Sequence, residues 1–482
     1  MTSSINKQSI GQFEGHGDVG QLSRLGYCDY DAANQAYTIA AGANLRRQQD
    51  GFHFVWKRIR GNFIVTARAE FFEDWGNPHH KLGWMARASL EDNSTLVSSV
   101  VHGDGRIAMQ FRREAGGPTE VMPANVANAD VIQMERKGNS YITSFARFGK
   151  PFEMVRASQI DLGEEIYIGL FVSTDINEPI EQAIFRDVRI VRPVKDDFVR
   201  GRDPFGSLLE ILDVASGHRQ IIYRAEQVIE APNWTRDGKA LIFNRDGRLN
   251  RFELAMGTGT LIETGKVVRN NNDHVLSFDG SRLAISSHGE EDGLSRVYTV
   301  PVQGGQPKLV TPEGPSYLHS WSPDGKLLVY TGQRNGQYDI YRIPIEGGEE
   351  EQLTNTPGLE DGPEYTPDGR YIYFNSVRTG GMQIWRMRPD GSAQQQLTED
   401  EYNNWFPHIS PDGKWVIFIS YLVGEVAPSD HPAAKRVYLR LMPIDGGTPK
   451  VLAYLYGGQG TMNVPSWSPD GRQLAFVSNT VP

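Results

Sequence analysis

The sequence has 482 residues, 39% of them hydrophobic, and a formal net charge of −10 at pH 7. The length exceeds what a single hydrophobic core usually supports, which predicts two domains. The negative balance argues against nucleic-acid binding, which depends on basic side chains that neutralise phosphates, and no apolar run approaches the ~18 residues of a membrane span.

Cysteine and glycine usage narrow the class of protein further. Cys28 is the only cysteine, so no intrachain disulfide or cysteine-based zinc cluster can form. The 51 glycines and 27 prolines separate short runs of β-branched and aromatic residues, which predicts an all-β fold. The first residues lack the apolar core of a secretory signal. We therefore expect a cytoplasmic protein, or a periplasmic one if a leader has been removed.

The first part of the chain is a series of strands without a repeat. Strands are expected at 52–59, 62–71, 81–88, 96–101, 107–113, 131–136, 140–147, 165–173 and 183–191. This number of strands predicts a sandwich of two sheets. We expect the first domain at 1–195, a polar linker at 196–206, and the second domain at 207–482.

Segments 52–71, 81–90, 101–113 and 185–190 resemble the concanavalin-like jelly rolls that often occur beside or within carbohydrate-active proteins. The resemblance implies a jelly-roll β-sandwich, and alternate residues of its strands share a face. The side chains expected to line one concave sheet and bind a saccharide are Trp56, Arg58, Arg87, His102 and Arg112. Indole rings stack on sugars, and guanidinium groups pair with hydroxyls or carboxylates. Alternatively, the tryptophans belong to the core and the arginines to a solvated face.

A pentapeptide repeat organises the second part of the chain. Residues 321–325, with the sequence WSPDG, recur unchanged at 467–471 and with substitutions at 234–238, 276–280, 365–369 and 409–413. Successive Asp positions are 42, 45, 44, 44 and 58 residues apart, and the usual spacing matches a four-stranded propeller blade. The last copy supplies only two strands, and residues 209–224 supply the missing pair. The sequence therefore predicts a six-bladed β-propeller closed by its N- and C-terminal strands.

The six copies resemble the WD-like repeats of the TolB-type propeller family over nearly all of 207–482. The resemblance implies the fold but not a function, because the wider group includes protein-interaction modules, propeller caps of serine peptidases and polysaccharide lyases such as oligogalacturonate lyase. The sequence has no G-x-S-x-G nucleophile elbow, which argues against a peptidase.

The unusual residues of the repeats are expected at one mouth of the propeller, opposite the Pro-Asp-Gly turns. Four blades have a proline two residues before the repeat, whereas two blades have His274 and His319 there. The long last interval contains the segment 421–436, which we expect to cover the same mouth as a lid. Loops of this length are often functional.

Histidines and carboxylates at this mouth have the ligand types of a divalent-metal or acid–base site. The predicted metal ligands are His274, His319 and His408, and these three histidines with Glu364 and Asp430 are the predicted catalytic groups. Further ligand contacts are expected from Tyr317, Asn404, Trp405, His431, Tyr456 and Gln459. Alternatively, the histidines only pair with other buried polar groups of the channel.

Two functions fit these features. The first is a binding protein whose saccharide or protein ligand lies at the propeller mouth under the loop 421–436. The second is a carbohydrate-active enzyme, a metal-dependent lyase or a glycosidase, that uses the same histidines. The sequence shows no strong catalytic spacing, which favours the binding protein.

Overall fold

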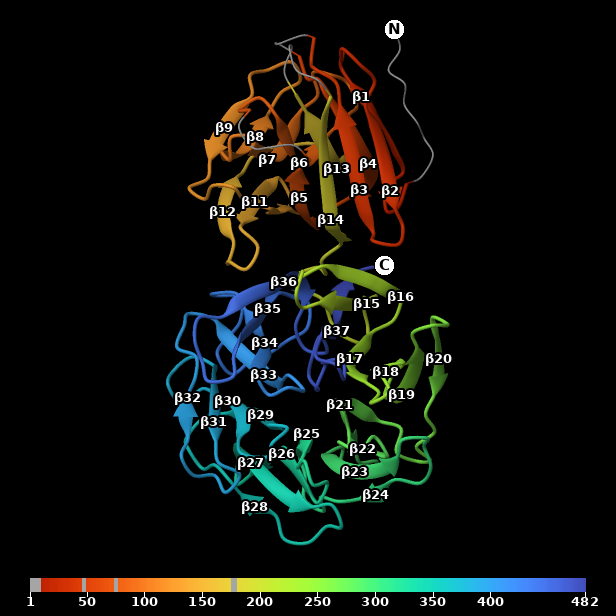
Figure 1. The fold of residues 1–482 in the computed structure, drawn as a ribbon, viewed down its shortest axis with the longest axis vertical. Helices are drawn as coiled ribbons and strands as arrows, with labels where there is room; N and C mark the ends of the chain where they lie inside the picture. The colour runs from red at the N-terminus through yellow and green to blue at the C-terminus, as the bar shows by residue number, and fades with distance from the viewer. Residues whose placement is uncertain (1–9, 46–48, 73–76, 175–179) are drawn as a thin grey trace. The chain divides into compact units, whose positions relative to one another are not determined.

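A computed structural model describes residues 10–45, 49–72, 77–174 and 180–482 of the chain (Figure 1). The chain divides into two compact units, Met1–Pro193 and Val194–Pro482. The described residues form strands and turns and contain no α-helix, which confirms the all-β prediction. Among them, no helix is long and apolar enough to cross a membrane.

The first unit contains two antiparallel sheets of seven strands each. The order in the first sheet is β1 (Gly15–Val19), β4 (Phe52–Arg60), β13 (Glu165–Ser173), β6 (Lys81–Arg87), β7 (Leu96–His102), β8 (Ile107–Arg112) and β9 (Glu120–Pro123). The order in the second is β12 (Glu153–Ala157), β11 (Ser140–Ala146), β10 (Val131–Lys137), β5 (Phe63–Phe71), β14 (Glu181–Val191), β3 (Ala36–Ala41) and β2 (Tyr27–Asp31).

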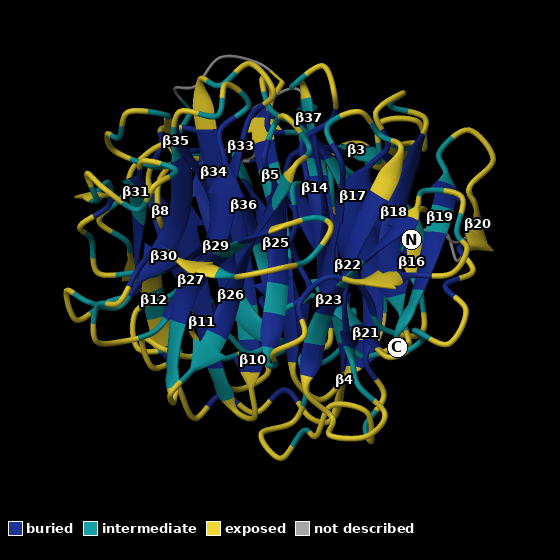
Figure 2. Cartoon of the chain, turned by 90° about the horizontal axis from the view of Figure 1, so that it is seen from below, coloured by how far each residue is buried: buried dark blue, intermediate teal, exposed yellow. Residues whose placement is uncertain are grey.

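Strand periodicity explains how the two sheets pack. In β5, Phe63, Val65 and Ala67 are buried in a core that also contains Val55 and Trp84 of the first sheet. The intervening residues of β5 point to the other face, because successive side chains of a strand alternate. The two sheets therefore share one hydrophobic core. In both units the strands are mostly buried and the connecting turns exposed (Figure 2).

The second unit is a ring of six small antiparallel sheets, the blades (Figure 1). Blade 1 contains β17 (Ile229–Trp234), β18 (Ala240–Arg245), β19 (Arg248–Glu253) and β20 (Thr258–Leu261); blade 2 contains β21 (Asn270–Leu276), β22 (Arg282–His288), β23 (Ser295–Pro301) and β24 (Lys308–Leu309); blade 3 contains β25 (Ser316–Trp321), β26 (Leu327–Arg334), β27 (Gln337–Pro344) and β28 (Glu351–Gln352). Blade 4 contains β29 (Glu360–Tyr365), β30 (Ile372–Ser376), β31 (Gln383–Met387) and β32 (Gln395–Gln396); blade 5 contains β33 (Asn403–Ile409), β34 (Trp415–Tyr421), β35 (Lys435–Pro443) and β36 (Lys450–Gly457); blade 6 contains β16 (Arg219–Ala225), β15 (Gly206–Asp213) and β37 (Gln473–Thr480).

Blade 6 joins the two ends of the propeller sequence. β15 pairs along its length with β37, from Gly206 opposite Thr480 to Asp213 opposite Gln473, which confirms the predicted six blades and the strand closure. The expected first strand of this blade is reduced to a single bridge between Trp467 and Leu474. Beyond this bridge, Ala475 and Val477 donate their backbone N–H groups to the carbonyls of Ser466 and Thr461.

The repeated sequence forms the same turn in every blade. In blade 3, the Ser322 hydroxyl and the backbone N–H of Lys326 both donate to Asp324 Oδ1, at 2.6 and 3.1 Å. Gly325 has φ of 69°, a left-handed conformation that glycine adopts without strain. The Ser/Thr-x-Asp-Gly pattern therefore recurs because each of its residues closes this turn.

Candidate functional site

The innermost strands of blades 1 to 5 each contain a β-bulge. In three blades a residue of the bulge has a positive φ and directly precedes the proline: Ala231 at 55°, Gly362 at 64° and Phe406 at 56°. The two blades with histidine in place of proline have no positive φ at the preceding residues, Asp273 and Leu318. The replacement of proline by histidine therefore accompanies a different backbone at this mouth.

His319 and Asp361 form a buried ion pair at this mouth. The distance from His319 Nε2 to Asp361 Oδ1 is 3.0 Å, and Thr331 donates its hydroxyl to the same oxygen at 2.7 Å. Burial acts to raise the pKa of Asp361, but the charge and hydrogen bond of His319 outweigh it and hold that pKa at about 2. Burial acts to lower the pKa of His319, yet the hydrogen bond to Asp361 and the nearby carboxylates raise it. Both partners are thus held in their charged forms.

The lid 421–436 contributes His431 to the same place. The His431 ring lies 4.3 Å from the Trp405 ring and 5.4 Å from the Phe406 ring, measured between centroids. His431 Nδ1 also hydrogen-bonds the side-chain oxygen of Gln459, and Nε2 lies 4.0 Å from Asp361 Oδ2. Three predicted ligand contacts, Trp405, His431 and Gln459, therefore do gather beside the His319 and Asp361 pair.

Asp273 completes what we term the mouth cluster, which consists of Asp273, His319, Asp361, Phe406 and His431. Burial raises the pKa of Asp273 to about 7, with His319 opposing this shift and the charges of Asp361 and Glu230 adding to it. Asp273 and Asp361 are thus two neighbouring carboxyl groups whose surroundings move their pKa values in opposite directions. Such a divergence is a feature of acid–base sites.

A cavity of about 390 Å³, the mouth cavity, adjoins the cluster through Gln459. Its lining is polar and includes Arg200, Glu230, Asp246, His288 and the asparagines 244 and 270–272. The amide nitrogens of Asn244 and Asn270 donate to backbone carbonyls. Their side-chain oxygens are buried, and the described protein supplies no donor to either. Two residues of the cavity lining, Asn244 and Asn270, therefore each have a buried side-chain oxygen that the described protein does not satisfy.

Several residues of this mouth were not among the predicted contacts. They include Asp361, Phe406, Asn244 and Asn270. The run of three asparagines from 270 to 272 was the available signal, because asparagines in an entry strand have no part in a hydrophobic blade core. Asp361 had no comparable signal, since its partner His319 comes from the neighbouring blade.

The three predicted metal ligands lie in separate surroundings. His274 is fully buried with Nε2 3.1 Å from the Ile242 carbonyl, and burial lowers its pKa to about 4. His408 instead hydrogen-bonds Glu364, with Nδ1 2.6 Å from Oε2. Within the residues that the structure describes, no three His, Cys, Asp or Glu side chains are grouped so as to hold a metal ion.

The other predicted mouth residues have mixed roles. Asn404 is fully buried and donates to Gln383, Thr398 and Asp400, so it ties together blades 4 and 5. Tyr456 accepts the backbone N–H of Val194 through its hydroxyl. Tyr317 is half-buried, and burial raises its pKa to about 12, with Tyr338, Asp273 and Asp361 adding to the shift. Asp430 is exposed on the lid.

The side chains that were predicted to bind a saccharide in the first unit share one face of one sheet. Arg58, Arg87 and Arg112 lie in one row across β4, β13, β6, β7 and β8, so their side chains share a face. Arg87 is fully buried and Arg112 nearly so, and both guanidinium groups bind Asp50, at 3.3 Å for Arg87 and 2.8 Å for Arg112. Arg58 is exposed and pairs with Glu14 at 3.2 Å.

Trp56 and His102, on the same face, are also largely buried. The Trp56 ring stacks on Phe54 at 5.8 Å, and His102 Nδ1 lies 3.0 Å from the Pro78 carbonyl. A cavity of about 510 Å³ opens on this face and includes Arg112 in its lining but not Arg87. Arg87 thus fixes loops at the rim of the sheet, and Arg112 is the predicted side chain that reaches the cavity.

Comparison with known proteins gives consistent matches for the propeller. A family model described as the TolB beta propeller domain matches residues 318–431. An uncharacterized protein of Agrobacterium fabrum is 46% identical over 278 residues, which cover 57% of this chain and 94% of that protein. The structure of a putative TolB from Agrobacterium tumefaciens is 46% identical, covers 57% of this chain and 98% of its own, and has a TM-score of 0.55. TolB from Acinetobacter baumannii is 19% identical over 53% of this chain and 65% of its own, with a TM-score of 0.43.

Proposed function

We propose that this chain, which belongs to the TolB-type β-propeller family, is a binding protein that holds a polyhydroxylated, saccharide-type ligand in the mouth cavity beside the loop 421–436. The unsatisfied side-chain oxygens of Asn244 and Asn270 carry this proposal. Hydroxyl groups are the donors that such acceptors need, and a buried acceptor left without a donor destabilises a protein by about 1–3 kcal/mol. The volume of about 390 Å³ lies within the range of small-ligand sites.

The lid supplies a way to retain the ligand. Gln459 lines the mouth cavity and hydrogen-bonds His431 of the lid. A ligand hydroxyl that binds Gln459 competes with His431 for the same side chain, so ligand binding and lid position are coupled through one residue. The aromatic rings of Trp405 and Phe406, buried under His431, then hold the closed lid in place.

The first unit is proposed as a second saccharide contact. We assign it the concanavalin-like jelly-roll sandwich implied by the sequence, over the proposed domain 1–195, with the cavity of about 510 Å³ as its ligand site. Gln110, Ser98 and Arg112 supply polar groups there, and Phe52 and Phe171 supply apolar surface. This mixture suits a sugar, which has both hydroxyl edges and apolar faces.

A second candidate is the carbohydrate-active enzyme, a lyase or a glycosidase. The opposite pKa displacements of Asp273 and Asp361 favour it, because a carboxyl with a pKa near 7 is suited to general acid–base catalysis at neutral pH. In such an enzyme, His319, which pairs with Asp361, is the positively charged side chain beside these two carboxyl groups. A divalent metal held by His274, His319 and His408 stays a prediction.

Titration calorimetry with a panel of neutral and acidic oligosaccharides tests the binding proposal. The variant Asn270→Ala removes one acceptor of the mouth cavity and is expected to weaken binding by about tenfold, since a hydrogen bond is worth about 1 kcal/mol or somewhat more. The matched control is Asn250→Ala, a buried asparagine of blade 1 outside the cavity lining. Equal losses in both variants, or binding of a protein partner but of no saccharide, would contradict the proposal.

Product analysis of the same panel separates the enzyme from the binding protein. Cleaved or unsaturated products that disappear in Asp273→Asn would establish catalysis at the mouth cluster. Saccharide binding without any product would leave the binding protein.

A further inference from the structure

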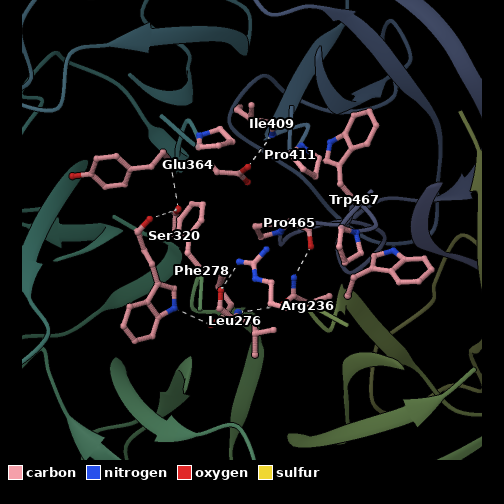
Figure 3. Close-up of a pocket in the computed structure, with 16 residues that line it drawn as sticks. Arg236, Leu276, Phe278, Ser320, Glu364, Ile409, Pro411, Pro465 and Trp467 are labelled. Atoms are coloured by element: carbon pink, nitrogen blue, oxygen red, sulfur yellow. Dashed lines mark hydrogen bonds between the residues drawn. The ribbon is translucent and has the colours of Figure 1, made fainter. Parts of the chain in front are cut away.

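The opposite end of the propeller channel contains a second cavity, the turn-side cavity, of about 140 Å³ (Figure 3). All six blades contribute to it at the ends of their innermost strands, next to the Pro-Asp-Gly turns. Its lining is mostly apolar and includes the three repeat tryptophans Trp234, Trp321 and Trp467. The exposed members of the lining are Arg236, Pro411 and Pro469, which therefore mark the opening.

Arg236 is the one basic side chain among the residues that line this cavity. It occupies the repeat position where four blades have Pro323, Pro367, Pro411 and Pro469. Its guanidinium extends into the space between the lining residues (Figure 3) and donates through Nε and Nη2 to the carbonyls of Ser277 and Leu276, at 3.1 and 3.3 Å. Neither bond neutralises its charge, because both acceptors are backbone carbonyls.

No carboxylate of the described residues forms an ion pair with Arg236. Glu364 and Asp279 act on it only at longer range. Glu364 lies 2.6 Å from His408 Nδ1, a separation that requires a proton between the two atoms, and His408 Nε2 faces the Met462 carbonyl at 3.0 Å. Wherever the shared proton lies, Glu364 and His408 together carry no net charge. Among the residues that line the cavity, Arg236 is therefore the one with an unbalanced charge.

Acceptors inside this cavity are already used, whereas one indole donor is not. Asn233, Ser320 and Glu364 each accept the backbone N–H of the next blade, at 3.0, 3.3 and 2.8 Å. The indoles of Trp321 and Trp467 donate to carbonyls of the preceding blade, both within 3.0 Å. Trp234 is 5% exposed, and the described protein supplies no acceptor for its indole N–H. An incoming group thus meets the Arg236 guanidinium, and the indole N–H of Trp234 is buried in the lining without an acceptor among the described residues.

We propose that the turn-side cavity binds a small monocarboxylate with an aromatic or branched apolar body, its carboxylate on Arg236 and its body among the tryptophans and prolines. The volume fits such a body, since a cavity of ~150 Å³ lined by apolar side chains is known to bind benzene. A carboxylate matches the planar guanidinium in charge and geometry. This site is separate from the mouth cavity and does not depend on the function proposed for that end of the channel.

Benzoate titrated into the full chain, followed by calorimetry and tryptophan fluorescence, tests the proposal. Two variants remove the charge: Arg236→Gln, and Arg236→Pro, which installs the residue that four other blades carry at this position. We expect each to weaken benzoate binding by at least about tenfold, the usual effect of losing a hydrogen bond to a charged group. Benzamide, which has the same body without the charge, is expected to bind more weakly than benzoate and to be insensitive to both variants.

Arg370→Gln is the matched control. Arg370 lies on a Pro-Asp-Gly turn at the same mouth and is exposed, but it does not line the cavity. This variant should leave benzoate binding unchanged, and so should Asn270→Ala, which separates this proposal from the one for the mouth cavity. The proposal is overturned if benzoate does not bind the wild-type chain, if Arg236→Gln binds it equally well, or if Arg370→Gln loses as much affinity as the Arg236 variants.

Discussion

Replacement of Asp273 by asparagine should stabilise the propeller, and the gain should grow with pH. Folding raises the pKa of this carboxyl from 3.8 to about 7, mainly through burial. The folded state therefore binds the proton more tightly than the unfolded state, so the wild-type protein loses stability as pH rises from about 4 to about 7. Asparagine has nearly the same shape and no charge, so the variant avoids this loss.

The size of this gain in folding stability follows from the pKa shift of Asp273. A displacement of about three pKa units corresponds to roughly 4 kcal/mol at pH 8, where the carboxyl is ionised in both states. At pH 5 the folded carboxyl is already protonated and the expected gain falls to roughly 2 kcal/mol, and at pH 4 it is below about 1 kcal/mol. The rise of this gain with pH is the decisive feature.

Scanning calorimetry of the full chain at pH 4, 5 and 8 measures the effect on the propeller transition. The control Asp430→Asn removes an exposed carboxyl of the lid and should change stability by no more than about 0.5 kcal/mol at any of these pH values. A gain for Asp273→Asn that is equal at all three pH values, or a loss at pH 8, would refute the reasoning that burial controls this carboxyl.

Three further predictions concern other buried charges. Asp361→Asn leaves His319 charged and unpaired, and it should destabilise the propeller by about 3–5 kcal/mol in chemical denaturation at pH 6; a loss below about 1 kcal/mol would show that the pair is not ionic. Arg219→Ala removes the guanidinium that binds Glu210 at 2.7 Å in the closing blade, where Glu210 is fully buried, so a loss of similar size is expected from the same measurement. Asp50→Ala removes the shared partner of two buried guanidinium groups and should lower the calorimetric transition of the first unit alone, and an equal drop in the propeller transition would contradict this.

The repeat made the propeller predictable, because its residues act locally. Asp324 and Gly325 close a turn within five residues, so one pattern reports one turn and six patterns report six blades. The closing strand was predictable for the same reason, since 209–224 carries the strand pattern that the last copy lacks. The reduction of the first strand of blade 6 to a single bridge was not predictable, because it depends on the path of the glycine-rich segment that precedes it.

The candidate site was harder to predict because its interacting side chains come from different blades. His319 and His274 occupy equivalent positions in the repeat, yet only His319 meets a carboxylate, which comes from the bulge of the next blade at Asp361. Likewise, the strand alternation placed Arg87 and Arg112 on one face correctly, but their burial follows from Asp50, a loop residue with no strand pattern. Sequence periodicity fixes which face a side chain occupies, and it does not encode which loop covers that face.

The pairing of β15 with β37 has a consequence for the synthesis of the protein. The end of β15 at Asp213 and the start of β37 at Gln473 are separated by 473 − 213 = 260 positions along the chain. At ~5–20 residues per second, a ribosome needs roughly ten to fifty seconds to make that length. Throughout this interval β15 has a free edge, of the kind that pairs readily with other chains. A nascent chain is therefore most prone to misassembly after its first unit has emerged and before its last strand arrives.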